Sequence, residues 1–147
     1  MTSTTAPSPR LPSLVSVRII TDDVARLAAF YQLVTGTTVR WATSDFAELP
    51  TTAGTLAIGS MRTVSLFGAG SAHPADNRTA IIEFLVDDVD ALHARLHEEL
   101  TGVGGTVVNE PTTMPWGNRS LLLRDPDRNL VNCFTPVTPE AIDKFGR

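Results

Sequence analysis

The same order of apolar and polar positions occurs twice along this chain. Residues 17–27 and 82–92 each begin with a run of β-branched and aliphatic side chains, which is typical of a strand. Both runs then meet an aspartate pair, at 22–23 and 87–88, which can cap the N-terminus of a helix. Because the offset is 65 residues throughout, the sequence predicts two copies of one structural unit.

Helical spacing follows each aspartate pair. Gly36 and Gly102 are the predicted stops of the two helices. The residues expected on the buried stripes are Val24, Leu27, Phe30, Tyr31 and Val34 in the first helix, and Val89, Leu92 and Leu96 in the second.

Short strand-like runs follow each helix. In the first copy they are residues 38–43, 46–49, 56–58 and 63–67, and in the second 106–109, 119–124 and 130–134. A turn at 125–129 joins the last two strands of the second copy. Both copies therefore read as βαβββ modules of an α+β protein.

The 147 residues fit one compact unit with the following divisions. Residues 1–12 are polar and proline-rich and read as a disordered tail. The first module spans 13–67, a linker rich in Gly, Ala, Ser and Pro spans 68–78, and the second module spans 79–136. Residues 137–147 form an extension with a short helix at 139–145.

Composition and charge exclude several partners. A net charge of -4 and a pI near 5.2, without a local basic cluster, argue against nucleic-acid binding. The longest apolar run, 79–86, contains Glu83 and is far shorter than the roughly 20 residues that span a bilayer, so we expect no membrane segment. The first residues hold no apolar signal-peptide core, which predicts a cytoplasmic protein.

Two candidate reactive groups are expected to be inert. The single Cys133 lies inside an apolar run, where a buried thiol is a poor nucleophile. His93 and His97 have the i, i+4 spacing of a zinc-binding pair, but no glutamate follows His93 directly. We expect these histidines on a solvated helix face.

The repeat and its motifs resemble the vicinal oxygen chelate superfamily, which includes glyoxalase I, the bleomycin-resistance proteins and the extradiol dioxygenases. The resemblance covers roughly residues 14–136. Its carriers are Ile20-Thr21-Asp22-Asp23, Ala29-Phe30-Tyr31 and Gly36 in the first copy, and Val86-Asp87-Asp88-Val89, Pro115-Trp116-Gly117 and Asp125-Pro126-Asp127-Arg128-Asn129-Leu130 in the second.

One residue in the last motif departs from the family pattern. Arg128 stands where the family usually has glycine, in a tight turn that is expected to need a positive φ. Arginine there implies some strain, unless Asn129 takes the left-handed conformation instead.

The resemblance implies two curved mixed sheets whose concave faces enclose a cavity, with helices on the convex faces. In metal-using relatives the ligands are His, Gln or Glu on the first and last strands of each module. The matching positions here are Ser16, Ile81, Ser65 and Asn132. None is an imidazole or a carboxylate, so we expect no metal and no other cofactor, although an error of register could leave Glu83 as a ligand.

Arg18 and Glu83 are the polar pair expected to point into this cavity, at equivalent positions of the two copies. They would grip and orient a ligand, or else form a buried ion pair that only satisfies itself. The remaining expected ligand-binding residues are Trp41, Phe46, Trp116, Asn132 and Phe134, because aromatic walls with a few polar anchors suit a flat organic ligand.

Two functions remain open from the sequence, besides the possibility that the pocket is vestigial and the protein is only an interaction scaffold. The first is a metal-free protein that sequesters a small organic ligand, an antibiotic or a metabolite, in the manner of bleomycin-resistance proteins. The second is an enzyme: a metal-dependent lyase or dioxygenase, or a metal-free catalyst that uses Glu83. The resemblance also implies a homodimer, with each cavity built within one chain or across two.

Overall fold

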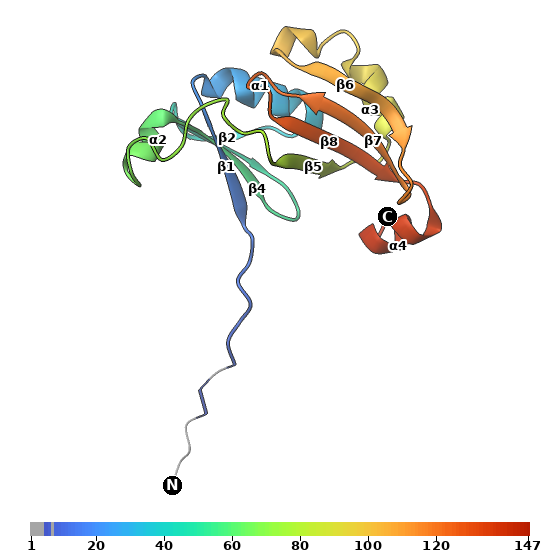
Figure 1. Cartoon of the computed structure of the whole chain (residues 1–147), viewed down its shortest axis with the longest axis horizontal. Coiled ribbons are helices and arrows are strands. Elements are labelled where there is room, and N and C mark those ends of the chain that lie inside the picture. Colours follow the sequence, from blue (N-terminus) through green and yellow to red (C-terminus); the bar gives the residue numbers. More distant parts are fainter. Residues whose placement is uncertain (1–4, 7) are drawn as a thin grey trace.

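The structure is a computed structural model that describes residues 5–6 and 8–147. Part of the predicted disordered tail, residues 1–4 and 7, lies outside the described residues. The described residues before 16 contain no helix or strand and extend away from the folded body (Figure 1).

Two modules follow one another along the chain. The first consists of β1 (Ser16–Thr21), α1 (Val24–Thr35), β2 (Arg40–Thr43), β3 (Phe46–Pro50), β4 (Thr55–Ser60) and α2 (Met61–Ser65). The second consists of β5 (Ile81–Leu85), α3 (Val89–Leu96), a 3-10 helix η1 (Thr101–Val103), β6 (Thr106–Thr113), β7 (Asn118–Arg124), β8 (Leu130–Pro136) and α4 (Pro139–Phe145). The α+β class and the repeated βαβββ order are as the sequence predicts.

Each module forms a four-stranded mixed sheet with the same topology. The strand orders are β1-β4-β3-β2 and β5-β8-β7-β6. In each sheet the first and last strands pair in parallel, and the other pairs are antiparallel. Because β1 and β5 each have one neighbour in their own sheet, each module has its first strand at an edge.

The two long helices begin as the sequence predicts. Asp23 and Asp88 accept hydrogen bonds from the backbone N–H groups of Arg26 and Ala91, both at 3.0 Å, which satisfies helix donors that otherwise lack partners. Gly36 ends α1 at φ +69°, and its N–H donates to the carbonyl of residue 32. All eight residues expected on the two buried stripes are buried.

A single hydrophobic core joins the modules. Helices α1 and α3 lie on the same side of the molecule and cover one face of both sheets (Figure 1). Phe30 and Tyr31 are fully buried there, and the Tyr31 ring lies 6.1 Å from that of Phe84 on β5. The modules therefore share their core and form one folding unit.

A buried hydrogen-bond network ties α1 to the turn between β7 and β8. The Tyr31 hydroxyl donates to Asp125 Oδ2 at 2.6 Å, and the Asn129 side-chain amide donates to the same oxygen at 2.8 Å. Asp125 Oδ1 accepts the backbone N–H groups of Asp127 and Asn129 at 2.9 Å each. Asn77 of the linker donates to Asn129 Oδ1 at 3.1 Å, so the most specific family motif anchors two other segments, α1 and the linker.

The predicted strand at 63–67 is wrong. Helix α2 starts at Met61, where the Ser60 side chain caps it by accepting the Arg62 N–H at 3.2 Å. The last strand of the first module is β4, which is longer than the predicted 56–58 and completes the sheet between β1 and β3. The strand-like composition of residues 63–67 was outweighed by the Ser60 cap, which starts a helix directly after β4.

In the β7–β8 turn, Arg128 itself adopts the left-handed conformation, with φ +67°. The positive φ expected at this position is confirmed, whereas the alternative that Asn129 takes it is wrong. Asn129 is 2% exposed, and its backbone N–H and side chain both donate hydrogen bonds to Asp125. These contacts fix its conformation, so it does not take the positive φ in place of Arg128.

The short helix predicted at 139–145 is present as α4, capped by Thr138, which accepts the N–H of Ala141 at 3.3 Å. Among the described residues, no helix is long and apolar enough to cross a membrane.

Candidate ligand-binding faces

The candidate site lies on the sheet faces turned away from the long helices. Ile19, Ile82 and Phe84 pack against the helix-covered core, so the alternate residues Arg18 and Glu83 point to the opposite faces. Both residues are exposed, and neither lines the best-formed pockets of the described chain. In the single chain these faces are open.

Arg18 stands between two aromatic rings. Its guanidinium carbon lies 5.0 Å from the ring centre of Phe46 on β3 and 5.2 Å from that of Phe67, which follows α2. Both are within the range of a cation–π contact. The described chain places no carboxylate within 4.0 Å of this guanidinium, so its hydrogen-bond donors are free for a ligand.

Glu83 has a different partner. Its Oε2 accepts a hydrogen bond from the Asn132 side chain at 2.8 Å, across the parallel pair of β5 and β8. Because Arg18 and Glu83 form no ion pair and are exposed, the buried, self-satisfying pair considered from the sequence is wrong. The open face of each sheet thus carries one charged side chain, Arg18 on the first and Glu83 on the second.

Two of the four aromatic residues expected in the site, Phe46 and Phe134, lie on the open faces, and the expectation for Trp41 is wrong. Phe46 lies on the same face as Arg18, and Phe134 lies on the same face as Glu83, where it packs on Phe145 at 5.0 Å between ring centres. Trp41 pairs with the fully buried Ala47 and so belongs to the helix-covered side of its sheet. Trp116 is 67% exposed in the loop before β7.

The structure corrects one of the four metal-ligand positions. Ser65 is an exposed residue of α2, not of a strand. Arg18 pairs with Ala57, and its counterpart Glu83 pairs with Asn132, so Ala57 is the true equivalent of Asn132. With Ala57 in place of Ser65, the four candidate metal-ligand positions supply one oxygen fewer.

The residues at these positions do not fit a divalent metal. They are Ser16, Ala57, Ile81 and Asn132, which together supply one hydroxyl and one amide. Such a set lacks the imidazole or anionic donors that hold zinc, iron or manganese. The described residues also contain no group of three or more His, Cys, Asp or Glu side chains placed to hold a metal ion.

Cys133 is as inert as expected. It is fully buried on β8, and burial raises the pKa of its thiol to about 12. At neutral pH the thiolate needed for nucleophilic attack is therefore almost absent.

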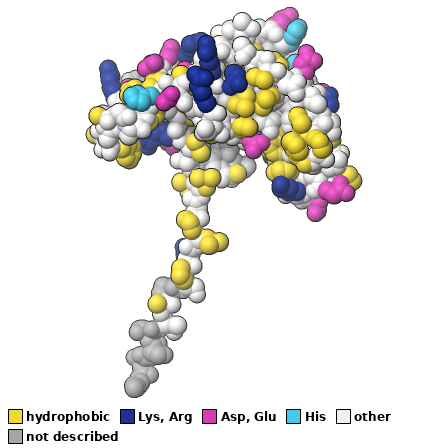
Figure 2. All heavy atoms as spheres, in the orientation of Figure 1, with side chains coloured by type: hydrophobic (Ala, Val, Ile, Leu, Met, Phe, Trp, Pro, Cys, Tyr) yellow, Lys and Arg dark blue, Asp and Glu magenta, His cyan; other side chains and the backbone are white. Residues whose placement is uncertain are grey.

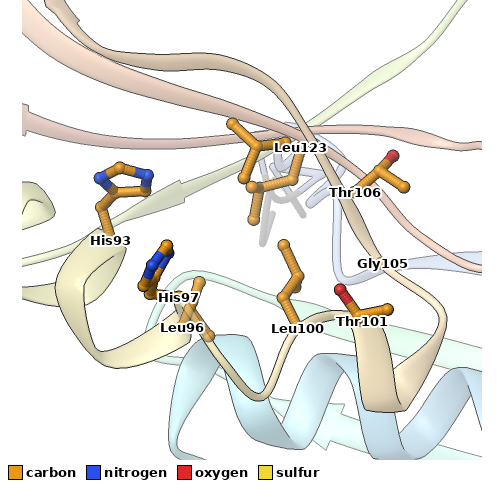
Figure 3. Close-up of a pocket in the computed structure, with 9 residues that line it drawn as sticks. His93, Leu96, His97, Leu100, Thr101, Gly105, Thr106 and Leu123 are labelled. Carbon is orange, nitrogen blue, oxygen red and sulfur yellow. The ribbon is translucent and has the colours of Figure 1, made fainter.

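His93 and His97 line a pocket of about 230 Å³ between α3 and β6 (Figure 3). Its floor is apolar, formed by Leu96, Leu100 and Leu123. His97 is exposed and His93 half-buried, which agrees in part with the expected solvated helix face. Two imidazoles without a third donor make a weak metal site.

Sequence reasoning missed two residues of the candidate faces. Each lies at or just after the end of a short helix that follows the last strand of a module: Phe67 two residues after α2, and Phe145 as the last residue of α4. Their signal was the residue that caps each short helix, Ser60 for α2 and Thr138 for α4. The repeat therefore extends to βαβββα, with a phenylalanine beside each open face.

The sequence matches the Glyoxalase/Bleomycin resistance protein/Dioxygenase superfamily over residues 13–133. No curated protein matches the sequence at a significant level.

Solved structures with the same fold are numerous. A glyoxalase/bleomycin resistance protein/dioxygenase family enzyme from Burkholderia phytofirmans PsJN is 22% identical, with a TM-score of 0.72 over 86% of this chain and 100% of that one. A glyoxalase-related enzyme from Fulvimarina pelagi is 18% identical, with a TM-score of 0.70 over 85% and 88% of the two chains. A glyoxalase/bleomycin resistance protein/dioxygenase from Nocardioides is 18% identical, with a TM-score of 0.67 over 90% and 88%.

At these identities the structural neighbours support the fold alone. The match of the sequence itself extends over most of both modules and includes the Asp125–Asn129 turn. This chain therefore belongs to the Glyoxalase/Bleomycin resistance protein/Dioxygenase superfamily.

Proposed function

We propose that this protein is a metal-free binding protein that sequesters a small organic ligand, an antibiotic or a metabolite, on its open sheet faces. The observation that carries the proposal is Arg18, whose guanidinium lies 5.0 and 5.2 Å from two aromatic rings and has no carboxylate partner in the described chain. A cation held in this way is already positioned before a ligand arrives, which reduces the entropy lost on binding.

The surroundings of Arg18 favour a flat ligand that carries a carboxylate. A guanidinium donates two parallel hydrogen bonds to a carboxylate, and the rings of Phe46 and Phe67 offer apolar surface beside it. Glu83, held by Asn132, can accept a hydrogen bond from a hydroxyl or amino group of the ligand.

The binding-competent form in this proposal is a homodimer in which the partner chain covers the open faces. Apolar side chains beside these faces are exposed to an extent that is unfavourable in a monomer: Phe67 is 76% exposed, and Ile81 on the edge strand β5 is 51% exposed. Covering them would also exclude water from Arg18 and strengthen its interaction with a bound anion.

Calorimetric titration with aromatic carboxylates, beginning with naphthoate, tests the ligand assignment. We expect naphthoate to bind more tightly than its neutral amide, and Arg18→Ala to weaken binding by about tenfold or more, since a charged hydrogen bond is lost. Arg62→Ala, an exposed change on α2, is the matched control and should bind as the wild type does. Equal affinity in Arg18→Ala and wild type would remove Arg18 from the site.

Metal analysis tests the metal-free part of the proposal. Protein purified without chelator should contain far less than one equivalent of zinc, iron, nickel or manganese, because the four ligand positions lack strong donors. One equivalent of any of these metals would contradict it and favour a metal-dependent lyase or dioxygenase.

A metal-free enzyme that uses Glu83 is the second candidate. The observation in its favour is a carboxylate held at 2.8 Å by Asn132 on an open face, in reach of a bound ligand. Turnover of a bound compound that disappears in Glu83→Gln, while the variant still binds that compound, would establish catalysis. Binding without turnover by both proteins would establish sequestration.

A further inference from the structure

Three arginines surround a pocket where the linker meets the β7–β8 turn. The pocket has a volume of about 330 Å³ and is lined by Ala75, Asn77, Arg78, Ala80, Arg124, Arg128 and Leu130. None of these residues belongs to the set around Arg18 and Glu83. Figure 2 shows basic side chains gathered over this part of the molecule.

The positive charge of this pocket is not neutralised by the protein. No carboxylate is among its lining residues, and no ion pair within 4.0 Å involves Arg78, Arg124 or Arg128 in the described chain. Of the two acidic residues of the turn, Asp125 has both oxygens engaged in buried hydrogen bonds, and Asp127 forms no ion pair within 4.0 Å in the described chain. The protein as a whole has a net charge of -4, so the positive charge of these three guanidinium groups is opposite in sign to that of the protein.

The backbone gives a second reason to connect this pocket with binding. Ala75 (φ +59°) and Arg128 (φ +67°) are the non-glycine residues with positive φ in the described chain, and both line the pocket. A glycine would hold the turn at 128 without strain, so the turn itself does not need an arginine side chain. Strained residues of this kind are concentrated at sites that bind ligands.

The arrangement of the turn keeps two arginines together. Arg124 Nη1 donates to the carbonyl oxygen of Arg128 at 3.0 Å, which restrains the Arg124 side chain beside the turn. Asn77, which donates to the buried Asn129, holds the linker and therefore Arg78 against the same turn. A hydrogen bond thus restrains the side chain of Arg124, while the backbone segments that carry Arg78 and Arg128 are held beside it by the linker and the turn.

We propose that Arg78, Arg124 and Arg128 bind the phosphoryl group of a small molecule. A phosphate dianion has three terminal oxygens, which can share the donors of three guanidinium groups, whereas a single carboxylate can use only one or two of them. Apolar contact with Ala80 and Leu130 leaves room for an organic part of the ligand. Inorganic phosphate and organic phosphate monoesters share this chemistry, and the experiment separates them.

The test compares wild type with Arg128→Gly, by calorimetric titration and thermal unfolding at low ionic strength, where exposed charges are least screened. The probes are inorganic phosphate and phenyl phosphate, with benzoate as a single-carboxylate control. Because glycine adopts φ +67° without strain, Arg128→Gly should unfold at a higher temperature than wild type without ligand. The same variant should bind phosphate about tenfold or more weakly, so loss of binding cannot be attributed to loss of the fold.

Arg124→Gln and Arg78→Gln should also weaken phosphate binding, while Arg62→Gln on α2 should bind as wild type does. Tighter binding of phenyl phosphate than of inorganic phosphate would identify the natural ligand as an organic phosphate, and the opposite order would identify free phosphate. Undetectable binding of both probes, or equal affinity in wild type and Arg128→Gly, would overturn the proposal. These outcomes are independent of whether naphthoate binds at Arg18.

Discussion

Tyr31→Phe is the perturbation that best tests the network joining the modules. Tyr31 is fully buried, and its hydroxyl donates to Asp125 Oδ2 at 2.6 Å. The change removes one oxygen and leaves the ring, so packing in the core is almost preserved. What is lost is one donor to a buried carboxylate, which retains three others from Asn129 and Asp127.

We expect Tyr31→Phe to lower the free energy of unfolding by about 1.5–2 kcal/mol, the lower part of the range for hydrogen bonds to charged groups. For a chain of this size that corresponds to a fall of about 3–8 °C in Tm. The measurement is urea unfolding followed by far-ultraviolet circular dichroism, because both tryptophans lie at partly exposed positions and are poor reporters of the core.

The pH dependence of this loss has a definite sign. The Tyr31 hydrogen bond stabilises the charged form of Asp125, so the loss should be largest at neutral pH and shrink as acid protonates that carboxyl. A double-mutant cycle with Asp125→Asn should give a coupling energy of about 1 kcal/mol or more at neutral pH. A loss below about 0.5 kcal/mol, or one independent of the residue at 125, would refute the reasoning.

Three further changes probe other parts of the structure. Gly105→Ala should lower the free energy of unfolding by about 1–3 kcal/mol in urea titrations, because its Cβ would lie 2.6 Å from the buried ring of Phe30 and 2.7 Å from Leu100. Cys133, with a thiol pKa of about 12, should react with Ellman's reagent in urea but not in native protein, and fast native labelling would show that β8 opens. Burial raises the pKa of Asp125 in the folded protein above its ordinary value of 3.8. The protonated carboxyl therefore makes its full contribution to the free energy of unfolding below pH 3.8, and this contribution is lost as the pH rises through the folded-state pKa. The stability of wild type relative to Asp125→Asn should therefore decrease from acid to neutral pH, and an increase would contradict the stated cause.

The open faces show most clearly where sequence reasoning stops. Alternation along β1 and β5 correctly separated the residues under the helices from Arg18 and Glu83, because side chains on a strand alternate between faces whatever the rest of the fold does. It could not show that Arg18 would lie between Phe46 and Phe67, since these three residues come from β1, β3 and the segment after α2. That contact depends on strand order and on a helix that replaced an expected strand.

The sequence by itself determined the two modules and their long helices, because periodicity and capping aspartates are local properties. Only the tertiary structure decided which residue is equivalent to Asn132, since that follows from the pairing of parallel strands and not from distance along the chain. The cluster of Arg78, Arg124 and Arg128 likewise exists only in the folded chain, where Asn77 and Asn129 hold the linker against a distant turn. Both features depend on contacts between segments far apart in the sequence, which no local pattern encodes.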